Sequence, residues 1–178
     1  MTKISATSLN WISSTGGPYI LTNQFTALEW GGVESISKGS KQQYSNDYER
    51  ACEIKNYCGI IFNQNKPILV IGDTPNDMAV LELKENGILL IKWVGAESEE
   101  QILASLHNID NLTFDDQNLS FPIEDENLVV FDASATFKGS ANNKLFVNGK
   151  RGNYGVGVLN FAPTDDLILQ LIKLSFEK

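Results

Sequence analysis

The stretch "YCGIIFNQNKPILVIGDTPND", residues 57–77, contains two short apolar runs, each followed by a turn-forming string. Residues 57–62 and 67–71 are rich in isoleucine, valine and aromatic side chains, and the polar string "NQNK" between them is typical of a tight turn. Adjacent parallel strands would need a crossover of about a dozen residues. The spacing therefore predicts two antiparallel strands joined by a hairpin.

The same pattern continues on both sides of this hairpin. Short apolar runs bounded by turn strings such as "KENG" predict further strands. They cover residues 18–21, 79–83, 87–94, 119–123, 128–131, 144–147 and 154–161. We expect a β-rich α+β fold with mainly antiparallel sheets. Residues 167–176 fit both a strand and a helical stripe, and we favour the strand.

One clear helix is expected near residues 98–108. The string "SEEQ" at residues 98–101 fits a capping box in which Gln101 reaches back to the first turn. Shorter helical turns are expected at residues 23–30 and 46–52. The apolar face of the clear helix consists of Ile102, Leu103 and Leu106.

The clear helix also suggests how the chain is divided. Residues 1–108 would form an antiparallel β meander closed by the helix, and residues 109–178 would form a second β-rich half packed against it. One single domain over residues 1–178 is the alternative, because 178 residues suit either arrangement.

The composition is that of an acidic globular protein. The formal net charge is −8, and because nucleic acids and anionic membranes bind basic patches, we expect neither as a partner. No apolar run reaches the roughly 20 residues of a membrane span, and the first residues lack the apolar stretch of a secretory signal. We therefore expect a cytoplasmic protein. The two cysteines, Cys52 and Cys58, are too few for a disulfide framework and are expected to be reduced.

The string "VIGDTPNDM" at residues 70–78 is similar to the fourth motif of haloacid dehalogenase-like phosphatases. A buried strand would end at Gly72, and Asp73 and Asp77 would supply carboxylates for a hard cation. In "LVVFDASAT", Asp132 follows a predicted strand and would be the nucleophile. A phosphatase is therefore one hypothesis for this chain.

Three observations disfavour the phosphatase. Ser134 stands where that family has a second aspartate, Asp132 follows Asp73 in the reverse of the usual order, and the gaps around residue 70 are too short for parallel crossovers. Turn chemistry explains "GDTPND" better, with Pro75 fixing φ. The sole histidine, His107, ends the predicted helix and is expected to be structural. We expect no catalysis, no metal and no cofactor.

Several strings carry a closer family resemblance. In the first hundred residues they are "WISSTGGPYIL" (11–21), "WGG" (30–32), "DYERACEIKNYCGII" (47–61), "LVIGDTP" (69–75) and "IKWVGAESEE" (91–100). In the second half, "VVFDASATFKG" (129–139) and "GNYGVGVLNFAPTDD" (152–166) are similar more loosely. Together they resemble the immunity protein 21 family of bacterial polymorphic toxin systems.

This resemblance implies a mostly β protein that binds a cognate toxin and neutralises it in the producing cell without catalysis. On this interpretation "GDTP" is a recurrent turn, and Asp73 holds no metal. The motif residues are expected to have structural roles. They are Trp30, Gly32, Asp47, Tyr48, Arg50, Gly72, Asp73, Pro75 and Trp93.

Acidic residues predominate in one part of the chain, because no lysine or arginine occurs between Lys92 and Lys138. A solvated face is one explanation of such a run. The other is docking, since many polymorphic toxins act on nucleic acids through basic clefts, and an acidic surface can be steered onto such a cleft. We predict that the partner is a cognate toxin with a basic active-site cleft. The predicted contact residues are Asp115, Asp116, Glu124, Asp125 and Glu126.

Overall fold

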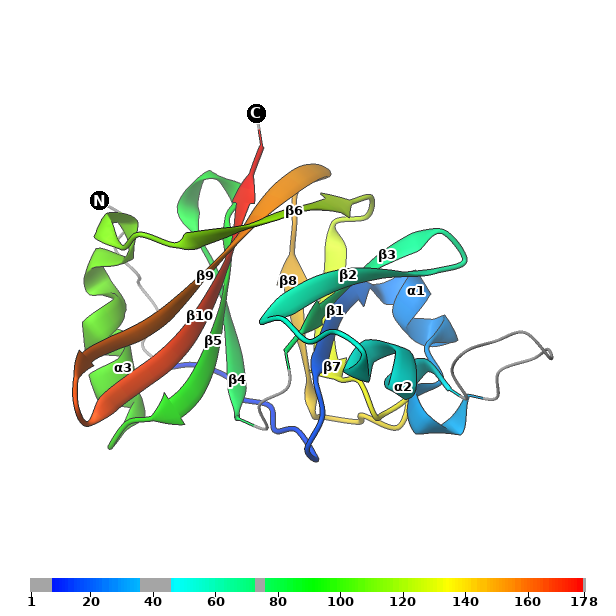
Figure 1. Ribbon diagram of the computed structural model, residues 1–178, viewed down its shortest axis with the longest axis horizontal. Coiled ribbons are helices and arrows are strands. Elements are labelled where there is room, and N and C mark those ends of the chain that lie inside the picture. Colours follow the sequence, from blue (N-terminus) through cyan, green and yellow to red (C-terminus); the bar gives the residue numbers. More distant parts are fainter. Residues whose placement is uncertain (1–7, 36–45, 73–75, 178) are drawn as a thin grey trace.

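Two five-stranded antiparallel sheets pack face to face in the computed structural model (Figure 1). The structure describes residues 8–35, 46–72 and 76–177. The first sheet has the strand order β2-β3-β1-β7-β8, and the second has the order β4-β5-β10-β9-β6. The strands of the first sheet are β1 (Tyr19–Asn23), β2 (Cys58–Asn63), β3 (Lys66–Ile71), β7 (Asn127–Asp132) and β8 (Lys144–Asn148). Those of the second are β4 (Met78–Glu82), β5 (Ile88–Gly95), β6 (Asp115–Ile123), β9 (Gly152–Thr164) and β10 (Leu167–Phe176).

The predicted β-rich fold with antiparallel sheets is confirmed. The hairpin that opened the sequence analysis is β2 and β3, which pair from Cys58 opposite Ile71 to Asn63 opposite Lys66. The ambiguous segment at residues 167–176 is the strand β10, which lies at the centre of the second sheet.

The main core lies between the two sheets. Leu69 and Val130 from the first sheet share one buried cluster with Leu90, Val156 and Ile172 from the second. Side chains on a strand point alternately to its two faces, so each sheet also presents apolar side chains on its outer face. Both outer faces therefore need a cover.

Short helices cover the outer face of each sheet. Over the first sheet lie α1 (Gln24–Glu29) and α2 (Asp47–Cys52), whose Ala27 and Ala51 pack with Ile20, Val70 and Phe131. Over the second sheet lies α3 (Glu99–Ser105), which continues as the 3-10 helix η3 (Leu106–Asn111). Figure 1 shows α3 and the α1–α2 pair on opposite sides of the sandwich. Within the described residues, none of these helices is long and apolar enough to span a bilayer.

The helix expected near residues 98–108 begins as predicted and ends differently. Ser98 is the N-cap, and its hydroxyl accepts a hydrogen bond from the Gln101 backbone N–H at 3.3 Å. The Gln101 side chain accepts a hydrogen bond from the backbone N–H of Glu97 at 2.9 Å, one residue before the N-cap Ser98. The α-helix stops at Ser105 and tightens into η3. The short helical turns predicted at residues 23–30 and 46–52 are α1 and α2.

The chain passes between the sheets several times. The consecutive strands β3 and β4 lie in different sheets, so residues 1–108 do not form the single meander that was expected. The chain crosses again from β6 to β7 and from β8 to β9. Each sheet therefore contains strands from both sides of residue 108, and a division at that residue does not follow the sheets.

Candidate partner-binding surface

Asp132, the nucleophile of the phosphatase hypothesis, joins two loops at the end of β7. One carboxylate oxygen accepts hydrogen bonds from the Thr15 backbone N–H at 2.6 Å and from the Thr15 hydroxyl at 3.0 Å. The other accepts from the Ser134 backbone N–H at 2.8 Å. Burial would raise the pKa of Asp132, but these donors hold the pKa of the carboxyl below its usual value. The residue is 2% exposed, so the carboxylate fastens loops together rather than facing a substrate.

The Trp-Gly-Gly string docks onto the same turn. Trp30 is 1% exposed, and its indole N–H donates to the Ala133 carbonyl at 2.9 Å. Gly32 has φ +55°, and a Cβ there would lie 2.3 Å from the Ser134 carbonyl oxygen. Only glycine combines this left-handed conformation with so close an approach. These contacts fix the direction in which α1 leaves the sheet.

The motif residues of α2 hold neighbouring segments. Asp47 pairs with Arg50 at 3.1 Å and accepts a hydrogen bond from the Gly31 backbone N–H at 3.0 Å. Arg50 also donates to the Phe62 carbonyl on β2 at 2.6 Å. The ring of Tyr48 lies against Gly17, where an added Cβ would come within 2.5 Å of it. All three side chains therefore make internal contacts.

The remaining motif residues lie near the end of β3 and on β5. Gly72 donates its N–H to the Tyr57 carbonyl at 2.7 Å, and its own carbonyl accepts from the buried Lys92 ammonium at 2.8 Å. Trp93 packs edge to face against Trp11, with 5.2 Å between the ring centroids. Asp73 and Pro75 lie outside the described residues.

The structure gives the phosphatase hypothesis no support. Its fold would require parallel strands, whereas the strand pairs of both sheets are antiparallel. In the part of the chain that the structure describes, no group of three or more His, Cys, Asp and Glu side chains could hold a metal ion. Asp77, the second carboxylate of the predicted metal loop, lies in the described part of the chain, and its backbone carbonyl accepts a hydrogen bond from the Trp93 N–H at 2.9 Å.

His107 places its ring nitrogen Nδ1 2.9 Å from the Leu103 carbonyl at the end of α3.

The five carboxylates predicted to contact a partner form two separate groups. Asp115 and Asp116 begin the edge strand β6, and Glu124, Asp125 and Glu126 follow its end. A strand of this length spans roughly 25 Å at 3.3 Å per residue, so the two groups lie at opposite ends of β6. All five are at least partly exposed. The structure therefore does not bring the predicted residues into one cluster.

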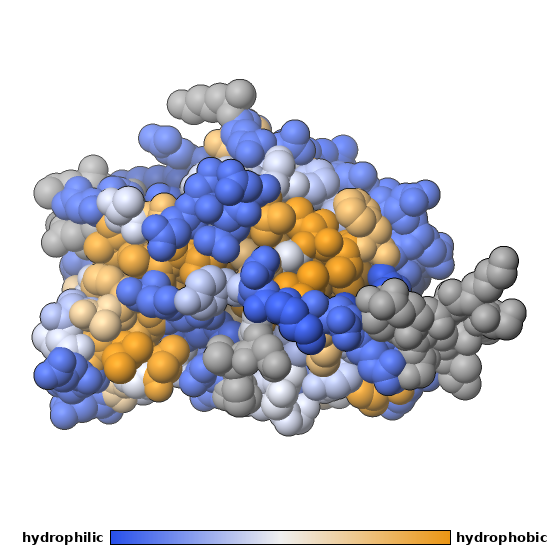
Figure 2. Space-filling view, in the orientation of Figure 1, coloured by the Kyte–Doolittle hydropathy of each residue, from blue (hydrophilic) through white to orange (hydrophobic). Residues whose placement is uncertain are grey.

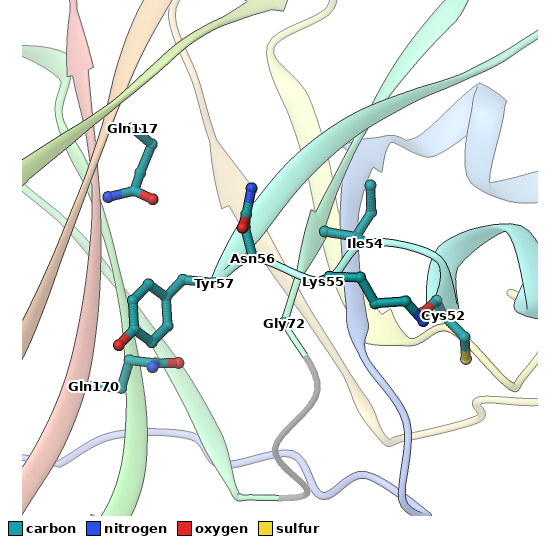
Figure 3. Close-up of a pocket in the computed structure, with 8 residues that line it drawn as sticks. All are labelled: Cys52, Ile54, Lys55, Asn56, Tyr57, Gly72, Gln117 and Gln170. Atoms are coloured by element: carbon teal, nitrogen blue, oxygen red, sulfur yellow. The ribbon is translucent and has the colours of Figure 1, made fainter.

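The residue after the first group, Gln117, lines a hollow between the sheets. This hollow of about 590 Å³ is lined by Cys52, Ile54, Lys55, Asn56, Tyr57, Gly72, Gln117 and Gln170 (Figure 3). Figure 3 shows the Tyr57 ring standing close to Gln170, and the Tyr57 hydroxyl accepts from the Asn160 side chain at 3.0 Å. Gln117 directly follows Asp116 on β6. Lys55 is the charged side chain of this lining, and the other lining groups are uncharged.

Apolar surface lies beside this hollow. In Figure 2 an apolar area near the centre of the face lies between β6 and β2 and is bordered by hydrophilic side chains. Ile60 on β2 and Leu119 on β6 are half-buried side chains that pack against the core between the sheets. This area is therefore the partly open side of the main core.

The second acidic group borders a smaller hollow of about 320 Å³ beside the start of α1. It is lined by Asn23, Phe25, Thr26, Glu29, Gln64, Lys66, Glu124 and Asp125. Glu124 pairs with Lys66 at 2.6 Å, and both side chains are half exposed. The Asn127 backbone N–H donates to Asp125 at 2.9 Å, and this hydrogen bond helps to hold the pKa of Asp125 below its usual value. Asp125 and Phe25 both line this hollow, so a carboxylate stands beside an aromatic side chain.

Sequence reasoning did not identify the exposed apolar side chains of α1. Phe25 is 70% exposed and Leu28 is 52% exposed, whereas Thr26 and Ala27 between them are buried. Residues three apart lie on the same face of a helix, so Phe25 and Leu28 form one outward face. The spacing of these two residues within a predicted helical turn was the available signal, but it did not show which face would be buried.

The fold and this surface define a class of protein: a helix-covered β-sandwich whose exposed carboxylates stand at the two ends of an edge strand. The family model described as Immunity protein 21 matches residues 10–167, which is most of the chain, and the chain belongs to this family. The resemblance found in the sequence is thereby confirmed. No match was found among curated proteins or among solved structures. Membership of an immunity protein family implies a toxin-neutralising role.

Proposed function

We propose that this protein binds one cognate toxin and neutralises it in the cytoplasm of the producing cell by occupying its surface, without turnover. The observation that carries this proposal is the family match over residues 10–167. The fastened position of Asp132 supports a binding role, because its carboxylate oxygens are taken up by Thr15 and Ser134.

The chemistry of the partner follows from the charge. The net charge of −8 and the exposed carboxylates at both ends of β6 favour a toxin with a basic active-site cleft. Opposite charges steer two proteins together and raise the association rate, most strongly at low salt. The proposed contact residues remain Asp115, Asp116, Glu124, Asp125 and Glu126.

The direct test needs a candidate toxin, to be sought among the products of the genes that neighbour the gene for this protein. Expression of that toxin alone should arrest growth, and co-expression of this protein should restore growth. A binding protein protects only when it is present in amounts equal to the toxin, whereas an enzyme would protect at much lower amounts. Protection at one tenth of the toxin concentration, or no binding at all by calorimetry, would contradict the proposal.

The proposed contact residues are tested by replacing the five with Asn or Gln. We expect the association rate to fall by about tenfold or more at low salt and its salt dependence to weaken. If the folded variant keeps both, these carboxylates form only a solvated face.

A further inference from the structure

The outward face of α1 combines apolar and acidic side chains, and the 3-10 helix η1 (Gly32–Glu34) that follows it also carries exposed side chains of both kinds. Phe25, Leu28 and Val33 are large exposed apolar side chains, and the neighbouring Glu29 and Glu34 are exposed as well. The hollow beside α1 brings Glu124 and Asp125 of the β6–β7 turn to the same place. We name Phe25, Leu28, Glu29, Glu124 and Asp125 the α1 surface.

We infer that the α1 surface is the toxin-docking surface, and that it receives an apolar contact point surrounded by lysine or arginine side chains. This inference rests on the proposed function and adds to it the position of the interface. It makes the two ends of β6 unequal, because only Glu124 and Asp125 at its C-terminal end belong to the α1 surface.

The exposure of the apolar side chains is built into the fold. Asn23 caps α1 by accepting a hydrogen bond from the Thr26 N–H at 2.8 Å, and Trp30 anchors its other end to Ala133 at 2.9 Å. With both ends fixed and Ala27 packed on the sheet, α1 cannot rotate to bury Phe25 or Leu28. An exposed aromatic side chain on a fixed helix binds a partner with little loss of conformational freedom, and aromatic residues are enriched at binding hot spots.

The charge around this apolar face selects the partner. Residues 8–35 of the described chain contain no lysine or arginine. Lys66 lines the hollow beside α1 and is already paired with Glu124 at 2.6 Å. An incoming basic side chain would lie between Glu29 and Asp125 and could stack on the ring of Phe25, since cations are attracted to aromatic faces. A partner with acidic side chains in this position would be repelled.

The larger hollow is a weaker candidate for the toxin interface. Its lining includes Lys55, which would repel a basic side chain, and its other lining side chains are uncharged. Asp115 and Asp116 stand near it without a large exposed apolar side chain in their own strand. We therefore expect these two carboxylates to steer association weakly and to add little to the stability of the complex.

The experiment measures binding of the toxin identified by the growth test to the full chain and to four variants. The apolar variant is Phe25→Ser with Leu28→Ser, and the acidic variant is Glu29→Gln with Asp125→Asn. The matched apolar control is Val94→Ser with Ile168→Ser. Both side chains are exposed, and they lie near the paired ends of β5 and β10. The competing acidic variant, at the other end of β6, is Asp115→Asn with Asp116→Asn. Circular dichroism melts confirm that each variant is folded.

We expect the apolar variant to raise Kd about 100-fold, as for two hot-spot residues, while its control changes Kd less than about threefold. The acidic variant should lower the association rate about tenfold at low salt, and the competing variant at Asp115 and Asp116 should lower it less. A wild-type chain that does not bind the toxin overturns the proposed function. A wild-type chain that binds, together with folded α1 variants that bind equally well, overturns only the inference, and a loss confined to Asp115 and Asp116 moves the interface to the other end of β6.

Discussion

Replacing Asp132 with Asn should destabilise the protein by about 3 kcal/mol near pH 7. The carboxylate accepts three hydrogen bonds from Thr15 and Ser134, whereas the amide of Asn offers only one oxygen. Either Thr15 or Ser134 then loses its acceptor and faces an N–H group. A hydrogen bond to a charged group contributes about 1.5–3 kcal/mol, and a buried unsatisfied donor costs about 1–3 kcal/mol. The loss is large beside the roughly 5–15 kcal/mol by which folded proteins are stable.

The same substitution should make stability less dependent on pH. Because the pKa of Asp132 is lowered in the folded protein, its contribution is fully present above the unfolded pKa of about 3.9. The contribution is lost as the pH falls through the lower folded pKa. The difference in unfolding free energy between wild type and Asp132→Asn should therefore shrink between pH 6 and pH 3.

Urea unfolding followed by tryptophan fluorescence measures both effects, because Trp30 is anchored to Ala133 beside the substituted residue. Asp115→Asn is the control, since Asp115 is exposed and should change stability by less than about 0.5 kcal/mol. A decrease in unfolding free energy of less than 1 kcal/mol at pH 7, or a decrease that stays constant down to pH 3, would refute the proposal that the charged Asp132 carboxylate holds the two loops together. A gain in stability would instead point to a strained catalytic group.

Three further substitutions or assays follow from the structure. Gly32→Ala should lower the free energy of unfolding in urea by about 2 kcal/mol more than Gly16→Ala does. Both glycines have positive φ, but only at Gly32 would an added Cβ clash, since at Gly16 it meets nothing within 4 Å. Equal decreases for the two variants would show that no clash occurs. Burial raises the pKa of the Cys58 thiol to about 11, so Ellman's reagent at pH 8 should modify the partly exposed Cys52 first. Equal rates of modification of the two thiols would contradict the burial of Cys58. With magnesium and a panel of phosphomonoesters we expect no hydrolysis above background, whereas hydrolysis that disappears in Asp132→Asn would revive the phosphatase.

The strands could be predicted because each is a local pattern. Apolar runs and turn strings located the ten strands to within a few residues, including the hairpin of β2 and β3. The sequence did not reveal how the strands divide between sheets, because the string "GDTPND" before β4 is compatible both with a chain that folds back and with one that crosses over. The ambiguity of β10 has a clear cause: Leu171 faces the helix layer and Ile172 faces the other sheet, so both faces are apolar.

The binding surface was harder to predict than the fold. Charge counting found the acidic run but could not show that β6 holds Asp116 and Glu124 apart. The outward direction of Phe25 depends on Trp30 and its distant acceptor Ala133, and no local pattern contains that contact. The docking role of these residues stays a prediction.

The hydrogen bond from Trp30 to Ala133 also determines when α1 is held in place during synthesis of the chain. Its hydrogen-bond partner, Ala133, lies 103 residues further along the chain. Ribosomes add about 5–20 residues per second, so roughly 5–20 s pass between the synthesis of these two residues. Until then β1 lacks its neighbour β7, and α1 lacks the contact that directs it. On the inference that the α1 surface docks the toxin, a nascent chain that already contains all of α1 would give no protection, and protection would begin only after β7 and Ala133 have left the ribosome and folded back.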